Sequence, residues 1–164
     1  IPQDPTIFHA SLRENLTFYN PQASDEHLHA VIEKLGLSEL LVQLPQGLDT
    51  LIGEGARGLS GGQAQRIALA RVVLDERKRI ILFDEPTAHL DIETEMELKQ
   101  AMVEVMQERL VVFATHRLHW LDTLDYLLVL EEGKLVEQGT TTQLLESTTH
   151  FATLVRALRG GEAA

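Results

Sequence analysis

The apolar residues in the first half of the chain recur at helical spacing. One run follows Ser24, a residue type that caps helices, and ends at Leu35 just before a glycine. A second run begins at Ser60 and continues to Leu74. The glycine-rich stretch 45–62 separates them. Residues 37–44 predict a further short helix that ends before Pro45. The pattern therefore predicts two amphipathic helices, with this short helix and the loop 45–62 between them.

The second half alternates between uninterrupted apolar runs and a helical pattern. The runs 80–83 and 110–114 have the length of strands, and their continuous apolar character predicts strands buried on both faces. Between them, the apolar positions of 93–107 return at helical spacing. Two further runs, 126–130 and 135–137, flank a turn sequence and predict a hairpin. Strand, helix and strand in this order predict an α/β fold with a parallel sheet.

Composition narrows the class of protein. The 164 residues suffice for one domain or for a large part of a bigger one. With 25 acidic and 14 basic residues, the net charge is −11, which argues against a nucleic-acid partner. The chain holds no cysteine and no apolar stretch long enough to span a bilayer. We expect a helical subdomain over residues 1–75 and the α/β part over residues 76–164.

Two carboxylates follow the first predicted strand. Asp84 and Glu85 stand at the end where ligands bind in open parallel sheets, and Pro86 prevents the strand from continuing. In a nucleotide hydrolase the first carboxylate would hold Mg²⁺ and the second would polarise the attacking water. The alternative is an acidic pair that ends a strand and faces solvent.

The second predicted strand is followed by Thr115 and His116. Parallel neighbours would bring His116 to the same sheet edge as the carboxylates, where a histidine can bind a γ-phosphate or orient a water. The alternative is a polar residue that only ends a strand. A metal pair of His116 and His119 is disfavoured, because no third ligand follows at suitable spacing.

The sequence LSGGQ, residues 59–63, opens the second predicted helix. Ser60 and Gln63 form the S-x-x-Q pattern of a capping box. A helix N-terminus attracts anions, and Gly61 and Gly62 would let the backbone approach a phosphate closely. The alternative is a well-capped helix without a ligand. No G-x-x-x-x-G-K-[ST] loop occurs in the chain, so the pattern leaves open whose phosphate this would be.

Together these motifs resemble the ATPase domain of ATP-binding cassette (ABC) proteins. Gln3, LSGGQ, FDEP, AHLD and THR follow the order of that family's Q-loop, signature motif, Walker B motif, D-loop and switch histidine. The resemblance covers nearly the whole chain and implies a partial P-loop NTPase fold. In this family two ATPase domains pair head to tail, and each signature loop caps the ATP of the other domain. The phosphate would therefore belong to a partner's nucleotide.

The resemblance implies a role for each motif residue. Gln3 would sense Mg²⁺ and the attacking water, Asp84 would act on Mg²⁺, and Glu85 would be the catalytic base. His116 would contact the γ-phosphate, and Asp91 in the D-loop would reach across the dimer. ATP and Mg²⁺ are thus the implied cofactors. The residues that would meet the partner's ATP are Ser60, Gly61 and Gly62, with Gln63 beside them.

Two features depart from the family pattern. His89 stands in the D-loop where a small residue is usual, so the contact across the dimer would differ. No Walker A loop precedes Gln3, and we expect a segment of a longer protein that lacks the ATP cradle and is inactive alone. The alternatives are a docking or regulatory module without turnover, and a soluble ABC ATPase not linked to transport.

The sequence around the Q-loop and before the signature resembles the exporter branch of the family. In that branch the Q-loop segment and a glutamate, here Glu54, contact the transmembrane domain. The implied partners are that domain and a second ABC ATPase domain, identical or different, at the cytoplasmic face of a bacterial cell membrane. The amino-acid sequence of residues 44–66 and 83–91 resembles the CydD-like half of the heterodimeric exporters of cysteine and glutathione.

Overall fold

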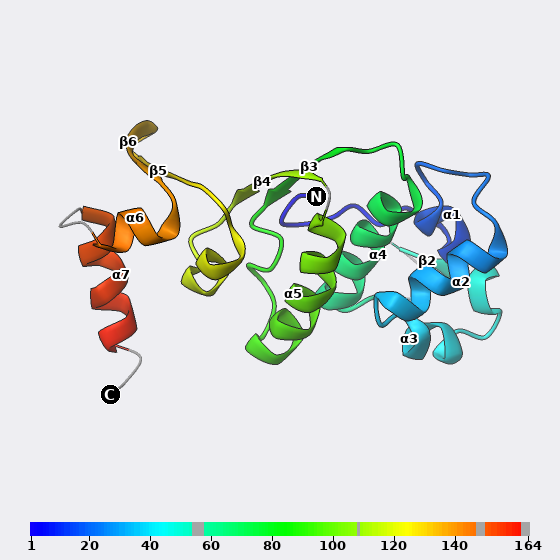
Figure 1. Ribbon diagram of the computed structural model, residues 1–164. Helices are drawn as coiled ribbons and strands as arrows, with labels where there is room; N and C mark the ends of the chain where they lie inside the picture. The colour runs from blue at the N-terminus through cyan, green and yellow to red at the C-terminus, as the bar shows by residue number, and fades with distance from the viewer. Residues whose placement is uncertain (54–57, 108, 147–149, 162–164) are drawn as a thin grey trace. The chain divides into compact units, whose positions relative to one another are not determined.

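The computed structural model describes residues 1–53, 58–107, 109–146 and 150–161 (Figure 1). They belong to two compact units, Ile1–Ala114 and Thr115–Ala164, and each unit is described by itself. The division at residue 75 that the sequence predicts falls inside the first unit and stays a prediction. Glu54, which the resemblance assigns to a membrane-domain contact, lies outside the described residues.

The helical part of the first unit is built around two capped helices. Helix α2 (Asp25–Lys34) begins after Ser24, whose side chain accepts a hydrogen bond from the His27 amide. Helix α4 (Gly61–Leu74) begins after Ser60. Both helices start where the sequence predicts. The shorter elements are β1 (Ala10–Ser11), α1 (Leu12–Leu16), α3 (Ser38–Gln43), a 3₁₀ turn (Gly47–Asp49) and β2 (Leu51–Ile52).

The stretch 45–62 was predicted to be a loop throughout, and this is wrong in part. It contains the 3₁₀ turn and β2, which pairs antiparallel with β1. A two-residue strand has no periodicity of its own, so its sequence carries no signal. Ile52 of β2 is fully buried, and the pairing of Ala10 with Ile52 fixes this segment against the start of α1.

The first unit also contains a two-stranded parallel sheet. Strand β3 (Ile80–Asp84) pairs in register with β4 (Leu110–Ala114), and α5 (Ile92–Met106) connects them. This confirms the predicted strand, helix and strand order. Asp91 caps α5, its side chain accepting a hydrogen bond from the Thr94 amide. The ribbon shows α4 and α5 below the two strands (Figure 1).

The prediction that these strands are buried on both faces is wrong. Ile81 and Phe83 of β3 are buried, but alternate side chains are exposed on both strands. One face of the sheet packs on the unit's helices, and within the described residues no layer covers the other. The exposed side chains on that face are Ile80, Leu82, Leu110 and Val112, with exposures of 60%, 61%, 63% and 56%.

The second unit has its own small core. A 3₁₀ segment (Leu118–Thr123) leads into an antiparallel hairpin of β5 (Leu127–Glu131) and β6 (Lys134–Gly139), followed by α6 (Thr141–Glu146) and α7 (His150–Gly161). The hairpin confirms the prediction. Its two turn residues, Glu132 and Gly133, have positive φ values of 49° and 75°, as a tight hairpin turn requires. The core consists of Leu121, Leu127, Leu144, Phe151 and Val155.

None of the helices among the described residues is both long enough and apolar enough to cross a membrane.

Candidate functional site

The signature helix α4 begins with the capping box that the sequence predicts. Ser60 Oγ accepts from the Gln63 amide at 3.2 Å, and Gln63 Oε1 accepts from the Ser60 amide at 3.0 Å. The first amides of a helix have no partner within the helix. Here the reciprocal cap uses the amides of Ser60 and Gln63 and leaves the intervening glycine amides at the positive end of the helix dipole. This arrangement suits an anion.

The two signature glycines also pack against the D-loop and the start of α5. A Cβ atom on Gly62, which is buried, would lie 2.6 Å from Cγ2 of Thr94, closer than real Cβ contacts allow. A Cβ atom on Gly61 would lie 3.4 Å from Cδ2 of Leu90, which is ordinary contact. Gly62 therefore has a packing role in addition to its predicted contact with a phosphate.

Asp91 lies in the D-loop and anchors the first turn of α5. The hydrogen bond from the Thr94 amide, followed by the Thr94 side chain, lowers the pKa of Asp91 below its usual range. The cap is thus strongest when the carboxyl group is ionised. The carboxylate of Asp91 is exposed and takes part in this cap. Its predicted reach across a dimer stays a prediction.

The Q-loop residue Gln3 is held at its backbone and at its side chain. Gln65 of α4, only 5% exposed, donates from Nε2 to the carbonyl oxygen of Gln3 at 2.6 Å and to that of Pro2 at 3.2 Å. The side-chain nitrogen of Gln3 lies 2.8 Å from Nε2 of His89. The Q-loop is therefore attached to the signature helix and to the D-loop.

The rest of the Q-loop segment is attached to α4 by Arg71, which is 7% exposed. Its guanidinium donates to the carbonyl oxygens of Asn15 and Thr6 at 2.7 and 2.8 Å, and to Asn15 Oδ1 at 2.9 Å. Asn15, fully buried, also bonds the backbone amide of Phe8. Two buried polar side chains of α4, Gln65 and Arg71, thus fix the path of residues 2–8.

The two predicted carboxylates stand at the end of β3. Asp84 is exposed, and its amide donates to the carbonyl oxygen of Ile1 at 3.0 Å. Glu85 follows with a φ of 48°, a left-handed conformation that costs a non-glycine residue about 1 kcal/mol or more. Its amide donates to the Ala114 carbonyl oxygen at 3.0 Å, at the end of β4. The sheet therefore directs both carboxylates to its C-terminal edge.

The structure brings most of the predicted site residues into one unit and leaves one in the other. Gln3, the signature residues, Asp84, Glu85 and Asp91 all belong to the first unit. His116 is exposed and belongs to the second unit. The expectation that His116 meets the carboxylates stays a prediction.

The carboxylate oxygens at the sheet edge are suitable ligands for a magnesium ion that also binds phosphates. Mg²⁺ prefers oxygen ligands and usually keeps only one or two carboxylates from the protein. Asp84 and Glu85 supply such oxygens at the strand end. Among the described residues no group of three or more His, Asp or Glu side chains gathers into a metal site of its own.

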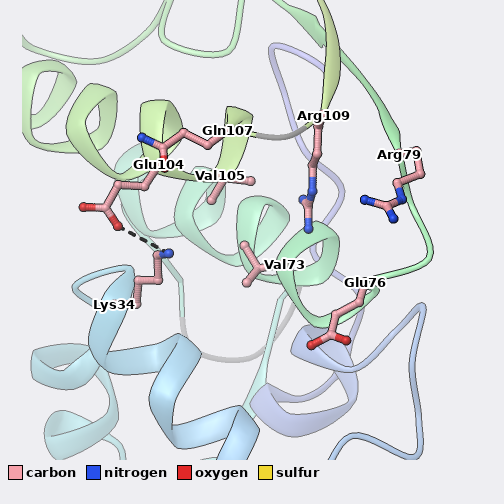
Figure 2. A pocket seen from close by; sticks show the side chains of 8 residues that line it. All are labelled: Lys34, Val73, Glu76, Arg79, Glu104, Val105, Gln107 and Arg109. Atoms are coloured by element: carbon pink, nitrogen blue, oxygen red, sulfur yellow. Dashed lines mark ion pairs between the residues drawn. The ribbon is translucent and has the colours of Figure 1, made fainter.

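Figure 2 shows a cavity in the first unit. Ion pairing across it joins Lys34 Nζ to Glu104 Oε2 at 3.3 Å. It lies where α2, α4 and α5 end and β3 and β4 begin, opposite the ends that carry Asp84 and Ala114. Helix C-termini attract cations, so its basic side chains need no bound anion to explain them. Its lining residues are Lys34, Val73, Glu76, Arg79, Glu104, Val105, Gln107 and Arg109.

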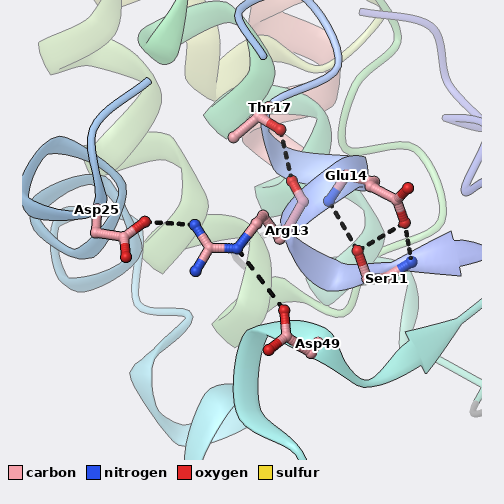
Figure 3. Close-up of polar contacts among 6 residues, drawn as sticks. All are labelled: Ser11, Arg13, Glu14, Thr17, Asp25 and Asp49. Atoms are coloured by element: carbon pink, nitrogen blue, oxygen red, sulfur yellow. Dashed lines mark hydrogen bonds and ion pairs between the residues drawn. The ribbon is translucent and has the colours of Figure 1, made fainter. Parts of the chain in front are cut away.

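A polar network around α1 orders the helical part that carries the signature (Figure 3). Ser11 and Glu14 form a second capping box, with amide-to-oxygen distances of 2.8 and 3.1 Å. Arg13 pairs with Asp25 at the start of α2, and its Nε lies 3.8 Å from Oδ1 of Asp49. Such exposed pairs add little energy individually. Their effect is to orient α1 relative to α2 and the 3₁₀ turn.

Sequence reasoning missed the two side chains that attach the Q-loop to α4. Gln65 and Arg71 are polar residues at buried positions of a helix. Their presence in an otherwise apolar face is the signal that could have identified them, because a buried donor needs a partner. The sequence singled out His89 as unusual but gave no sign of its contact with Gln3.

Comparisons with known proteins agree with the motif order. Residues 1–88 match the family model described as ABC transporter. The chain is 50% identical over 163 residues to the glutathione/L-cysteine transport system ATP-binding/permease protein CydC of Bacillus subtilis, covering 99% of this chain and 29% of that protein. The CydC protein of Escherichia coli is 40% identical, with 88% of this chain and 25% of that protein covered.

A solved structure agrees with the fold. The bacterial Atm1-family ABC exporter with ATP bound superposes with a TM-score of 0.81 at 34% identity, covering 96% of this chain and 27% of that one. The chain therefore spans less than a third of the length of each of these relatives. The matched family model, the fold and the order of the motifs lead to one conclusion: the chain belongs to the ABC transporter family.

Proposed function

We propose that this chain is part of the ATPase subunit of an ABC exporter, in which ATP binding and hydrolysis drive transport across a membrane. One observation carries the proposal: the Asp84 and Glu85 strand end and the capped signature helix lie in the same unit, joined through the D-loop. A module that only docks would not need carboxylates held at a sheet edge. The strained backbone of Glu85 is typical of a functional position.

In this proposal ATP and Mg²⁺ are the cofactors, and bound Mg²⁺ would neutralise charge that develops on the phosphates. Asp84 would hold the ion, and Gln3 would contact the ion and the attacking water. Glu85 accepts a proton from that water, and a positioned base of this kind contributes about 10²–10⁴-fold. His116 contacts the γ-phosphate. These assignments rest on the family resemblance. For Gln3, Asp84 and Glu85 they also rest on the position of all three residues in the first unit.

A second ABC ATPase domain is the proposed partner, paired head to tail. Ser60, Gly61 and Gly62 would cap the ATP of that partner, with Gln63 holding the cap in shape and Asp91 close to the shared surface. The exposed start of α4 supports this role, because Ser60 and Gly61 are both accessible. A helix N-terminus with free amides binds phosphate oxygens without a lysine.

A transmembrane domain is the second proposed partner, at the cytoplasmic face of the cell membrane. An exposed aromatic cluster supports it: the rings of Phe8 and Phe18 stack at 4.8 Å, and Tyr19 packs edge-on against Phe18 at 5.1 Å. The exposed fractions of these side chains are 38%, 48% and 47%. Arg71 lies within 5.7 Å of both phenylalanine rings and couples this surface to α4.

Cysteine or glutathione is the proposed cargo, because the two bacterial relatives are named as transporters of these compounds. Both relatives are CydC proteins, so we favour the CydC half of the heterodimer over the CydD-like half that the sequence wording suggests. Cargo contacts would lie in the transmembrane domain, so this part of the proposal rests on the relatives alone.

Substitution of the catalytic base tests the proposal in the exporter that contains this chain. Glu85→Gln should lower ATP hydrolysis by about 100-fold or more, because the amide cannot accept the proton. Glu93→Gln removes an exposed carboxylate from the first turn of α5 and should leave the rate within about 2-fold. Unchanged hydrolysis in Glu85→Gln would overturn the assignment.

Calorimetry on the chain alone tests the assignment of the signature loop to a partner's nucleotide. We expect MgATP to bind no more tightly than about 1 mM, or about −4 kcal/mol, since the chain contains no Walker A loop. Micromolar binding that Glu85→Gln leaves intact would mean that the signature residues form a nucleotide site within this chain.

A further inference from the structure

The D-loop histidine and the Q-loop glutamine are in direct contact within the first unit. Nε2 of Gln3 and Nε2 of His89 lie 2.8 Å apart. With the amide nitrogen of Gln3 as the donor, Nε2 of His89 accepts this hydrogen bond, which requires the neutral ring to carry its proton on Nδ1. His89 Nε2 also lies 3.7 Å from Oδ1 of Asp4, the residue after Gln3.

Both ends of this contact are fixed by other interactions. Gln65, buried in α4, holds the backbone carbonyl oxygen of Gln3 at 2.6 Å. His89 lies in a turn that begins with Thr87, whose hydroxyl is hydrogen-bonded to the buried Glu95 carboxylate. The turn ends at Asp91, the cap of α5. The hydrogen bond therefore joins two anchored backbones, and only the side chains of Gln3 and His89 need to be ordered.

We propose that His89 is a positioning residue that orients the side-chain amide of Gln3 for ATP hydrolysis. This rests on the proposed function, in which Gln3 contacts Mg²⁺ and the attacking water. Glutamine has three side-chain torsions, and a free amide at the surface would sample many directions. The bond to His89 restricts the amide to the edge of the D-loop, two residues before Asp91.

The same turn also contacts the signature helix. Leu90, next to His89, packs against Gly61, and Thr94 packs against Gly62. Displacement of the D-loop would thus disturb its contacts with Gln3 and with the signature glycines. We expect His89 to affect the rate of hydrolysis more than nucleotide affinity, because in this proposal His89 acts only by directing the side chain of Gln3 toward the attacking water.

The first test measures the contact and does not depend on hydrolysis. Nitrogen chemical shifts of the His89 ring report which nitrogen carries the proton. In the unmodified chain we expect the Nδ1–H tautomer of the neutral ring to predominate. In Gln3→Ala the ring should return to the Nε2–H form that free histidine favours. The same tautomer in both proteins would overturn the contact.

The second test measures hydrolysis in the exporter that contains this chain. His89→Ala should lower kcat by about 3- to 10-fold, the equivalent of one hydrogen bond, with the KM for ATP within about 2-fold. His89→Gln places an acceptor oxygen near the position of Nε2 and should restore most of the rate. His29→Ala, an exposed histidine on α2, is the control and should behave as the unmodified protein.

The outcomes separate the two proposals. An unchanged kcat in His89→Ala, or no difference between His89→Ala and His89→Gln, would overturn the positioning role even if the tautomer result holds. No hydrolysis by the unmodified exporter would overturn the proposed function, and the tautomer measurement would still decide whether His89 and Gln3 form the contact.

Discussion

Gly62 offers the sharpest test of how the signature helix is built. An alanine at this position would place its Cβ atom 2.6 Å from Cγ2 of Thr94, where contacts under 3.0 Å do not occur. Thr94 has a β-branched side chain, and its backbone amide donates to Asp91. The side chain of Thr94 therefore cannot move far. Overpacking of this kind costs about 1–3 kcal/mol.

A second contribution acts in the opposite direction. Gly62 lies inside the first turn of a helix with no positive φ, and alanine is favoured over glycine in helices by about 1 kcal/mol. We therefore expect Gly62→Ala to lower the free energy of unfolding by about 0–2 kcal/mol. That range alone would decide little, so the prediction concerns the coupling to Thr94.

Thr94→Ser removes the methyl group that causes the clash and keeps the hydroxyl. The double substitution Gly62→Ala/Thr94→Ser should be more stable than the sum of the single effects predicts, by about 1 kcal/mol or more. Urea unfolding followed by circular dichroism measures the four proteins. Gly61→Ala is the matched control, because its Cβ atom would make only ordinary contact with Leu90 at 3.4 Å. Additive effects within about 0.5 kcal/mol would refute the packing role of Gly62.

Three further predictions follow from the described residues. Glu85→Gly should be more stable than Glu85→Gln by about 1 kcal/mol in urea unfolding, because φ is 48° at this position, and equal stabilities would show that the backbone there is unstrained. The lowered pKa of Asp91 means that its cap stabilises the fold above the carboxyl's unfolded-state pKa and is lost as pH falls through the folded-state pKa. Asp91→Asn keeps a capping oxygen and should flatten the acid side of the stability curve, and superimposable curves would count against this account. The chain, of 18.3 kDa, should self-associate through the exposed face of the β3–β4 sheet, and Leu82→Lys should weaken this in light scattering whereas Val42→Lys, 86% exposed on α3, should not. A monomeric unmodified chain would contradict the last prediction.

The sequence predicts the elements that carry periodic patterns and misses those that depend on distant partners. The starts of α2 and α4, the parallel pairing of β3 with β4 and the β5–β6 hairpin follow from local spacing and capping residues. Strand β2 could not be predicted, because two residues acquire strand geometry only by pairing with β1. The exposure of Leu82 on an apolar strand was also missed, since an apolar run indicates strand formation but not what covers each face.

The candidate site divides in the same way. The capping box of Ser60 and Gln63 and the position of Asp84 and Glu85 at a strand end could be predicted from the sequence, whereas their roles toward ATP stay predictions. The contact of Gln3 with His89 could not, because 86 residues separate them and neither belongs to a periodic pattern. Tertiary contacts of this kind become visible only when the loop and the strand end are placed together.

The hydrogen bonds of Gln65 and Arg71 have a mechanical consequence. Both side chains are buried, and together they donate to the backbone of residues 2, 3, 6 and 15. Separation of the Q-loop segment from α4 would leave these donors without partners, at a cost of about 1–3 kcal/mol for each unpaired group. The Q-loop segment and α4 should therefore move together as one rigid body. We therefore expect a displacement of the exposed surface of Phe8 and Phe18 to move the start of α4 and not to bend the Q-loop segment.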